Sequence, residues 1–167
     1  MGLLYGRGVM QSDLSTLVSL LTTNFNGILA KLDADATVSG TTYVSANGVT
    51  APGVTYETAV GQTGMSQAGL YTWMNSFTTK FNAALTQLDG DAGVADTNYN
   101  ALWALSMGSM VPNGMSMGQI VAWLNKAITN IAGVTAKLDA DGTVTDTNYG
   151  SLWNVTDTVD ETGAVLS

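Results

Sequence analysis

The sequence predicts a mainly α-helical protein: a three-helix bundle built from three αα-hairpin-like repeats, with a small β-ribbon insertion near residues 41–60. Two observations predict this fold. First, the chain matches itself when it is shifted by 50 residues, and a weaker match follows at a shift of 56. Second, one segment in every copy places its core residues at alternating spacings of three and four, which is typical of packed helices.

The most similar part of the repeats is the motif Leu-Asp-x-Asp-x-x-Val-x-Asp-Thr-Asn-Tyr, which begins at Leu88 and again at Leu138. A weaker copy begins at Leu32, with Gly40 in place of the third aspartate. The whole chain, residues 1–167, is expected to form a single domain. Its predicted parts are an N-terminal arm at 1–8, repeat 1 with a β-ribbon linker at 9–64, repeat 2 at 65–114, repeat 3 at 115–154 and a C-terminal tail at 155–167.

Each repeat is expected to open with a long helix of roughly 22 residues, or about 33 Å. A serine precedes each helix as its predicted N-cap, and Ser116 with Gln119 forms a capping-box pattern. The three predicted N-caps are Ser12, Ser66 and Ser116. A parallel stack would place Leu21, Phe77 and Ala127 in one layer, which combines large, medium and small side chains. This complementarity favours packing within one chain, and it fits a parallel order and an up-down-up order equally well.

The segments after the motifs differ between the repeats. In repeats 2 and 3 we expect a turn and a short second helix, with Asp96 and Asp146 as N-caps. Repeat 1 instead continues into Thr41–Val60, where Asn47-Gly48 between β-branched residues predicts a hairpin. The tail is open to three interpretations: an extended segment, a second short ribbon, or an arm that reaches a neighbour.

The composition excludes several classes of function. Five Lys and Arg stand against thirteen Asp and Glu, a net charge of −8, which argues against binding to nucleic acid or to anionic lipid. The chain has no Cys and no His, which removes thiol nucleophiles, histidine bases and Cys/His metal sites. No apolar run approaches a membrane span of about 18 residues, and the start lacks a secretory signal or a myristoylation pattern. We therefore expect no catalytic residues, no cofactor and no enzymatic activity.

Eight of the thirteen acidic residues belong to the repeated motif, where they are open to two interpretations. Asp-x-Asp-Gly-x-Val is similar to part of an EF-hand calcium loop, but Lys137 stands at the first-ligand position and Asn148 at the last. The favoured interpretation is that the first two acids shape the turn and the third caps the short helix. The eight residues are Asp33, Asp35, Asp89, Asp91, Asp96, Asp139, Asp141 and Asp146.

Four tryptophans recur with the repeat, at Trp73, Trp103, Trp123 and Trp153. Aromatic rings can form a platform for sugar faces. At repeated helical positions, however, they are more often core residues or contacts between helices, which is the interpretation favoured for this chain.

The string Lys137-Leu-Asp-Ala-Asp, followed by Val-Thr-Asp-Thr-Asn-Tyr149, resembles a motif of small structural proteins of tailed bacteriophages. The resemblance covers about a dozen residues in each repeat. It implies a virion protein that is assembled in the bacterial cytoplasm, such as a head decoration protein, a head fibre or a part near the tail. Its implied partners are the major capsid protein or other virion proteins, with no nucleic acid and no membrane among them.

The leading hypothesis is therefore a non-enzymatic protein that binds the capsid exterior as a decoration or cement protein or as a head-fibre component. The candidate capsid contacts are Leu3, Leu4, Tyr5 and Arg7, which lie outside the heptads. The alternative is an adhesin module on a phage fibre or tail that binds carbohydrate or depends on calcium.

Overall fold

The structure is a computed structural model that describes residues 8–52, 55–57, 62–64, 66–159 and 165–166. The prediction of a mainly α-helical fold is confirmed. Three long helices alternate with three short ones, and each short helix spans five residues. The long helices are α1 (Gly8–Ala34), α3 (Gln67–Asp89) and α5 (Met117–Ala140), and the short helices are α2 (Tyr43–Asn47), α4 (Tyr99–Trp103) and α6 (Tyr149–Trp153).

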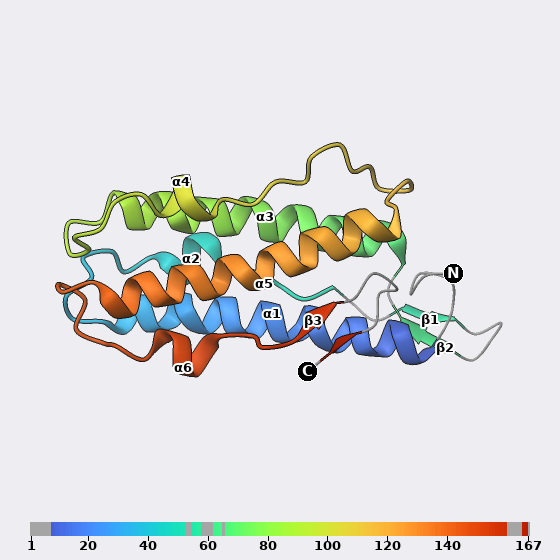
Figure 1. Cartoon of the computed structure of the whole chain (residues 1–167), viewed down its shortest axis with the longest axis horizontal. Coiled ribbons are helices and arrows are strands. Elements are labelled where there is room, and N and C mark those ends of the chain that lie inside the picture. The colour runs from blue at the N-terminus through green and yellow to red at the C-terminus, as the bar shows by residue number, and fades with distance from the viewer. Residues whose placement is uncertain (1–7, 53–54, 58–61, 65, 160–164, 167) are drawn as a thin grey trace.

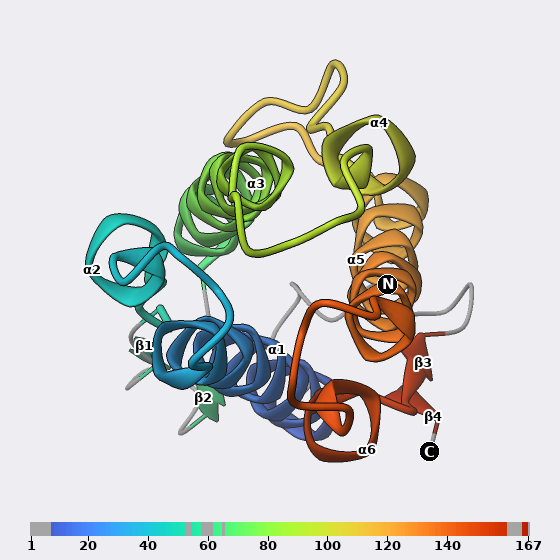
Figure 2. The same cartoon turned by 90° about the vertical axis from the view of Figure 1, so that its left-hand side faces the viewer.

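The three long helices run side by side in the same direction, because the chain returns along the outside after each short helix (Figure 1). Viewed along the helices, the molecule has an approximate threefold arrangement (Figure 2). Each short helix lies at the seam between its own long helix and the long helix of the next repeat: α2 between α1 and α3, α4 between α3 and α5, and α6 between α5 and α1. The third repeat therefore contacts the first, and the repeats form a closed ring.

Aromatic side chains fill the centre of the bundle. The Phe25 and Phe77 ring centroids lie 5.1 Å apart, and the indoles of Trp73 and Trp123 meet edge-on at 5.4 Å. Leu21, Phe77 and Ala127, which hold equivalent positions in the parallel repeats, are all fully buried. The small Ala127 on α5 leaves room for the large rings carried by α1 and α3.

The predicted helix starts are correct in repeats 2 and 3 and wrong in repeat 1. The Ser66 hydroxyl accepts a hydrogen bond from the Gly69 amide, and Ser116 forms the complete capping box with Gln119. In repeat 1, α1 begins at Gly8, so Ser12 lies inside the helix and is not its N-cap.

The region predicted as a β-ribbon differs from the expectation in its first half. Asn47 is the last residue of α2, a short helix that was expected only in repeats 2 and 3. The ribbon lies further along the chain, where β1 (Thr55–Glu57) pairs antiparallel with β2 (Gln62–Gly64). In the tail, β3 (Thr158–Val159) pairs antiparallel with β4 (Val165–Leu166), which matches the second of the three interpretations left open for it.

No helix within the described ranges combines the length and hydropathy needed to cross a membrane.

Candidate functional site

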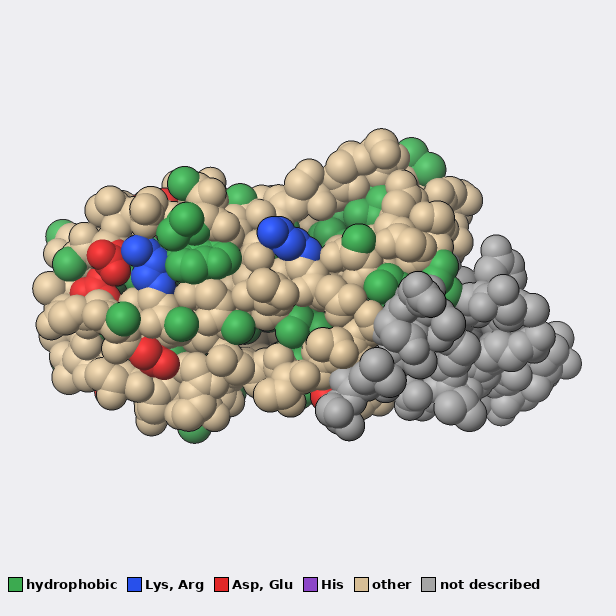
Figure 3. Space-filling model, viewed as in Figure 1, with side chains coloured by type: hydrophobic (Ala, Val, Ile, Leu, Met, Phe, Trp, Pro, Cys, Tyr) green, Lys and Arg blue, Asp and Glu red, His purple; other side chains and the backbone are tan. Residues whose placement is uncertain are grey.

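The repeated motifs meet at one end of the bundle, where the three long helices end. Each motif forms a loop that leaves its long helix, turns across the end of the molecule and reaches the following repeat (Figure 2). Acidic side chains gather at this end of the visible surface, while most of the remaining surface is neutral (Figure 3). We refer to these loops, residues 33–42, 89–98 and 139–148, as the motif loops.

The first aspartate of each motif caps the short helix that begins ten residues later. Oδ1 of Asp139 accepts the Tyr149 amide at 2.7 Å, and its Oδ2 accepts the Gly150 amide at 2.9 Å. Asp33 and Asp89 bind the starts of α2 and α4 in the same way. These carboxylates satisfy amides that a helix start leaves without intrahelical partners.

The prediction that Asp96 and Asp146 cap the short helices is wrong. The short helices begin after Asn98 and Asn148, whose side chains make no capping hydrogen bond. The sequence signal was misread because the true cap is remote: it lies at the end of the preceding long helix, not beside the short one.

The second aspartate of each motif joins its own loop to the loop of the preceding repeat. Asp91 accepts the Ser39 and Gly40 amides, both at 2.8 Å, and also the Gly93 amide of its own turn. Asp141 accepts the Asp96 amide, and Asp35 accepts the Asp146 amide, so the three connections form a closed cycle. A chain with antiparallel repeats could not form this cycle, because its motif loops would lie at opposite ends.

A buried tyrosine from each short helix lies near these carboxylates. The Tyr43 hydroxyl donates to Asp91 at 2.9 Å, and the Tyr149 hydroxyl donates to Asp35 at 3.5 Å. Burial, followed by the neighbouring carboxylates, raises the pKa of Tyr43, Tyr99 and Tyr149 above the ordinary value of 10.0. The hydroxyls therefore remain protonated at neutral pH, and the Tyr99 hydroxyl, unlike the other two, is buried without a hydrogen-bond partner among the described residues.

The buried aspartates have the opposite shift. Burial, the largest single effect, raises the pKa of Asp35, Asp91 and Asp141, but hydrogen bonds from backbone amides and side-chain hydroxyls outweigh it. The pKa of each carboxyl consequently lies below the ordinary value of 3.8. All three are ionised acceptors at neutral pH.

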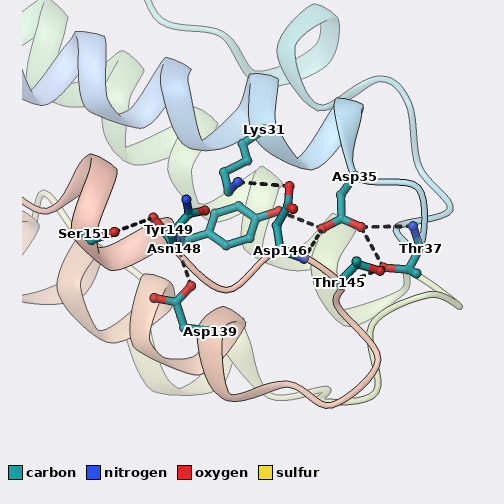
Figure 4. Close-up of polar contacts among 9 residues, drawn as sticks. All are labelled: Lys31, Asp35, Thr37, Asp139, Thr145, Asp146, Asn148, Tyr149 and Ser151. Atoms are coloured by element: carbon teal, nitrogen blue, oxygen red, sulfur yellow. Dashed lines mark hydrogen bonds and ion pairs between the residues drawn. The ribbon is translucent and has the colours of Figure 1, made fainter.

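The third aspartate forms an ion pair with a lysine of the next repeat (Figure 4). Lys31 lies 2.9 Å from Asp146, and its ammonium group lies 5.0 Å from the centre of the Tyr149 ring. Lys137 lies 3.3 Å from Asp96. In the remaining seam both charges are absent together, because Gly40 and Gln87 hold the equivalent positions.

Sequence reasoning also missed the small residues that receive the half-buried tryptophans. A side chain added to Gly27 would overlap the Trp153 ring, and one added to Gly133 would overlap the Trp103 ring. Trp73 and Trp123 are buried in the core, as predicted, and their indoles donate to Thr22 and Thr78 of the preceding repeat. Trp103 and Trp153 hold equivalent positions in the repeats, and so do Gly27 and Gly133. The recurrence of both residue types in two of the three repeats was the signal that could have revealed these seams.

The carboxylates of the site join the repeats to one another. Within the described part of the chain, no three acidic side chains lie close enough together to hold a metal ion. The Asp89 and Asp91 carboxylates each accept hydrogen bonds from backbone amides. The predicted capsid contacts, Leu3, Leu4, Tyr5 and Arg7, lie outside the described residues.

No protein family, no curated protein and no solved structure matches the chain.

Proposed function

We propose that the chain is a non-enzymatic structural protein of a tailed-phage virion, which binds the capsid exterior as a decoration or cement protein or as a head-fibre component. The observation that carries the proposal is the set of groups that the motif aspartates bind. Asp139 binds a backbone amide of its own short helix, whereas the second and third aspartates bind amides or a lysine of neighbouring repeats, so these carboxylates support a rigid block. The resemblance of the motif to phage structural proteins supports the same conclusion.

The proposed contacts with the capsid are Leu3, Leu4, Tyr5 and Arg7. Apolar side chains outside the heptads of the bundle are available for burial against a shell, and an arginine can pair with a carboxylate there in a bidentate geometry. The proposed partner is the major capsid protein or another protein of the assembled particle, met in the bacterial cytoplasm.

A deletion tests the proposal directly. Because α1 begins at Gly8, deletion of residues 1–7 removes the candidate contacts and leaves every described helix whole. The purified chain should co-sediment with undecorated capsids of the phage that encodes it, and the deletion should abolish this co-sedimentation without changing the melting temperature.

The matched control removes apolar side chains from elsewhere on the surface. Leu102 and Leu152 are each 52% exposed on α4 and α6, so a variant carrying both Leu102→Ser and Leu152→Ser should still bind capsids. Failure of the intact chain to bind capsids would overturn the proposed function. Full binding by the deletion variant would instead overturn the assignment of the contacts to residues 3–7.

A further inference from the structure

Two grooves lie at equivalent places in the ring. One, the α5 groove, has a volume of about 510 Å³ and lies between residues 106–110 and α5. The other, the α3 groove, has a volume of about 520 Å³ and lies between residues 48–52 and α3. A shift of 50 residues places the α3 wall on the α5 wall, with Trp73 on Trp123 and Ser76 on Lys126.

The third equivalent place holds a strand of the chain itself. The return segment of repeat 3 is β3, which Asn125 of α5 fixes through two hydrogen bonds to Val159, at 2.7 and 2.8 Å. Strand β4 pairs with β3 and lies against α1 (Figure 1). An extended segment therefore occupies the position between a return segment and the next long helix, which is the position of the two grooves.

The groove walls differ from the α1 surface in polarity. On α1 the equivalent positions carry Leu17 and Leu20, whereas the grooves carry Trp73 with Ser76 and Trp123 with Lys126. The two indoles are 3% and 4% exposed, so they form the groove floors, and the exposed Ser76 and Lys126 stand at the walls. Neither Ser76 nor Lys126 forms a hydrogen bond or ion pair with any residue that the structure describes.

We propose that the α5 and α3 grooves bind extended segments of a partner protein, seated as β4 is seated against α1. The segment that fits is a short, extended peptide with an apolar side chain for the indole floor and, in the α5 groove, a carboxylate for Lys126. Volumes of this size lie in the usual range for ligand sites, about 300–1,000 Å³. Docking of an extended peptide in a surface groove, with pockets for alternate side chains, is a common mode of peptide recognition. This inference does not depend on the virion assignment.

The probe is an N-acetylated peptide with the sequence of residues 162–167, Thr-Gly-Ala-Val-Leu-Ser, and a free terminal carboxylate. Titration into the ¹⁵N-labelled full chain should produce saturable shifts of the Trp73 and Trp123 indole resonances and of the Gly108 amide. Amidation of the peptide carboxylate should weaken binding to the α5 groove about threefold, since an exposed ion pair contributes little.

Two variants fill one groove each and serve as controls for one another. Thr72 and Ala122 are exposed residues of the two groove walls. Thr72→Arg should remove the shift of Trp73 and keep that of Trp123, and Ala122→Arg should do the reverse. Ala101→Arg, an exposed change on α4 outside both grooves, should keep both shifts. Unchanged far-UV circular dichroism verifies that each variant is folded.

Four results would overturn the proposal. The first is the absence of a saturable shift at either indole, and the second is a shift that persists in the variant whose groove is filled. The third is a set of shifts confined to β3 and α1, which would mean that the peptide only replaces β4. The fourth is concentration-dependent shifts of the same indoles without peptide, which would assign the grooves to a second copy of this chain.

Discussion

Residues at the seams between repeats form matched pairs. Trp103 covers Gly133, and Trp153 covers Gly27, whereas the seam between repeats 1 and 2 carries Asn47 with Ala83 at the equivalent positions. The large residue and the glycine are therefore present together or absent together. A glycine is required where an indole lies directly on the helix backbone, because even a methyl group would occupy the space of the ring.

This pairing predicts a compensating substitution. Gly133→Ala should lower the free energy of unfolding by about 1–3 kcal/mol, because the added methyl group displaces the Trp103 indole. Trp103→Asn in the same chain reproduces the pair found in the other seam, so the double variant should be more stable than the sum of the two single changes predicts. Urea unfolding of the two single variants and the double variant measures this coupling.

The control is Gly142→Ala, an exposed glycine with no atom within 4 Å of an added methyl group. Its free energy of unfolding should change by no more than about 0.5 kcal/mol. Strict additivity in the Gly133 and Trp103 cycle would show that the two residues do not interact.

At the scale of elements, the five-residue helices depend on contacts outside themselves. A single helical turn is unstable in isolation, because helix nucleation fixes several residues for one hydrogen bond. Each short helix is held at its start by an aspartate from the end of the preceding long helix and by a buried tyrosine. The motif Asp-x₉-Tyr is thus a device that folds the chain back onto its own helix.

Substitution of the capping aspartate should loosen α6 selectively. Asp139→Ala leaves the Tyr149 and Gly150 amides without their acceptor, and loss of such a cap costs about 0.5–2 kcal/mol. Hydrogen exchange of these two amides should accelerate more than exchange in the middle of α5. Asp146→Ala is the comparison, since it removes the ion pair to Lys31 but no amide acceptor of α6, and should cost at most about 1 kcal/mol. Equal exchange rates in the two variants would contradict the capping role.

The long helices could be predicted from the sequence, whereas the structure of the segments between them could be predicted only in part. The 3–4 spacing of apolar residues is a local property that directly reflects burial of one helix face, so α3 and α5 were predicted with nearly correct bounds. Asn47-Gly48 is a strong hairpin signal in isolation, yet Asp33, ten residues before Tyr43, holds the same segment as a helix. A contact between residues ten positions apart overrides the turn preference of Asn47-Gly48, and the residues of the turn itself do not indicate it.

The candidate site was predictable at the level of residues but not of partners. The motif aspartates were singled out correctly as structural groups, but only the second of each motif has the predicted role: Asp35, Asp91 and Asp141 each accept an amide of their own turn. The first aspartate of each motif is the cap of the short helix, and the third, predicted as that cap, forms an ion pair instead. Their partners in other repeats, such as the Asp146 amide for Asp35, depend on the parallel order of the helices, which the sequence left open. The ring is therefore a property of the whole molecule: three loops of similar sequence become one network only when all three ends coincide.

The closed cycle predicts how the whole molecule responds to acid. The pKa of Asp35, Asp91 and Asp141 is lower in the folded chain than the ordinary value of 3.8, because the hydrogen bonds to each carboxylate outweigh its burial. A group with a depressed folded pKa stabilises the folded state above the unfolded value, and this contribution disappears as the pH falls through the folded value. The free energy of unfolding should accordingly be nearly constant from pH 7 to about pH 5 and should fall steadily below pH 3.8.

Acid unfolding should also be a single transition, because each repeat is bound to both of the others. Repeat 1 contains no tryptophan, so far-UV circular dichroism reports all three repeats, whereas tryptophan fluorescence reports directly on repeats 2 and 3. The two signals should change at the same pH. Asp91→Asn should reduce the acid dependence and lower stability at neutral pH by at least about 2 kcal/mol, because it replaces a charged acceptor of two amides from repeat 1. Asp157→Asn removes a carboxylate without a hydrogen-bond partner among the described residues and should change neither. A circular dichroism transition that precedes the fluorescence change would show that repeat 1 unfolds alone and that the ring does not act as one unit.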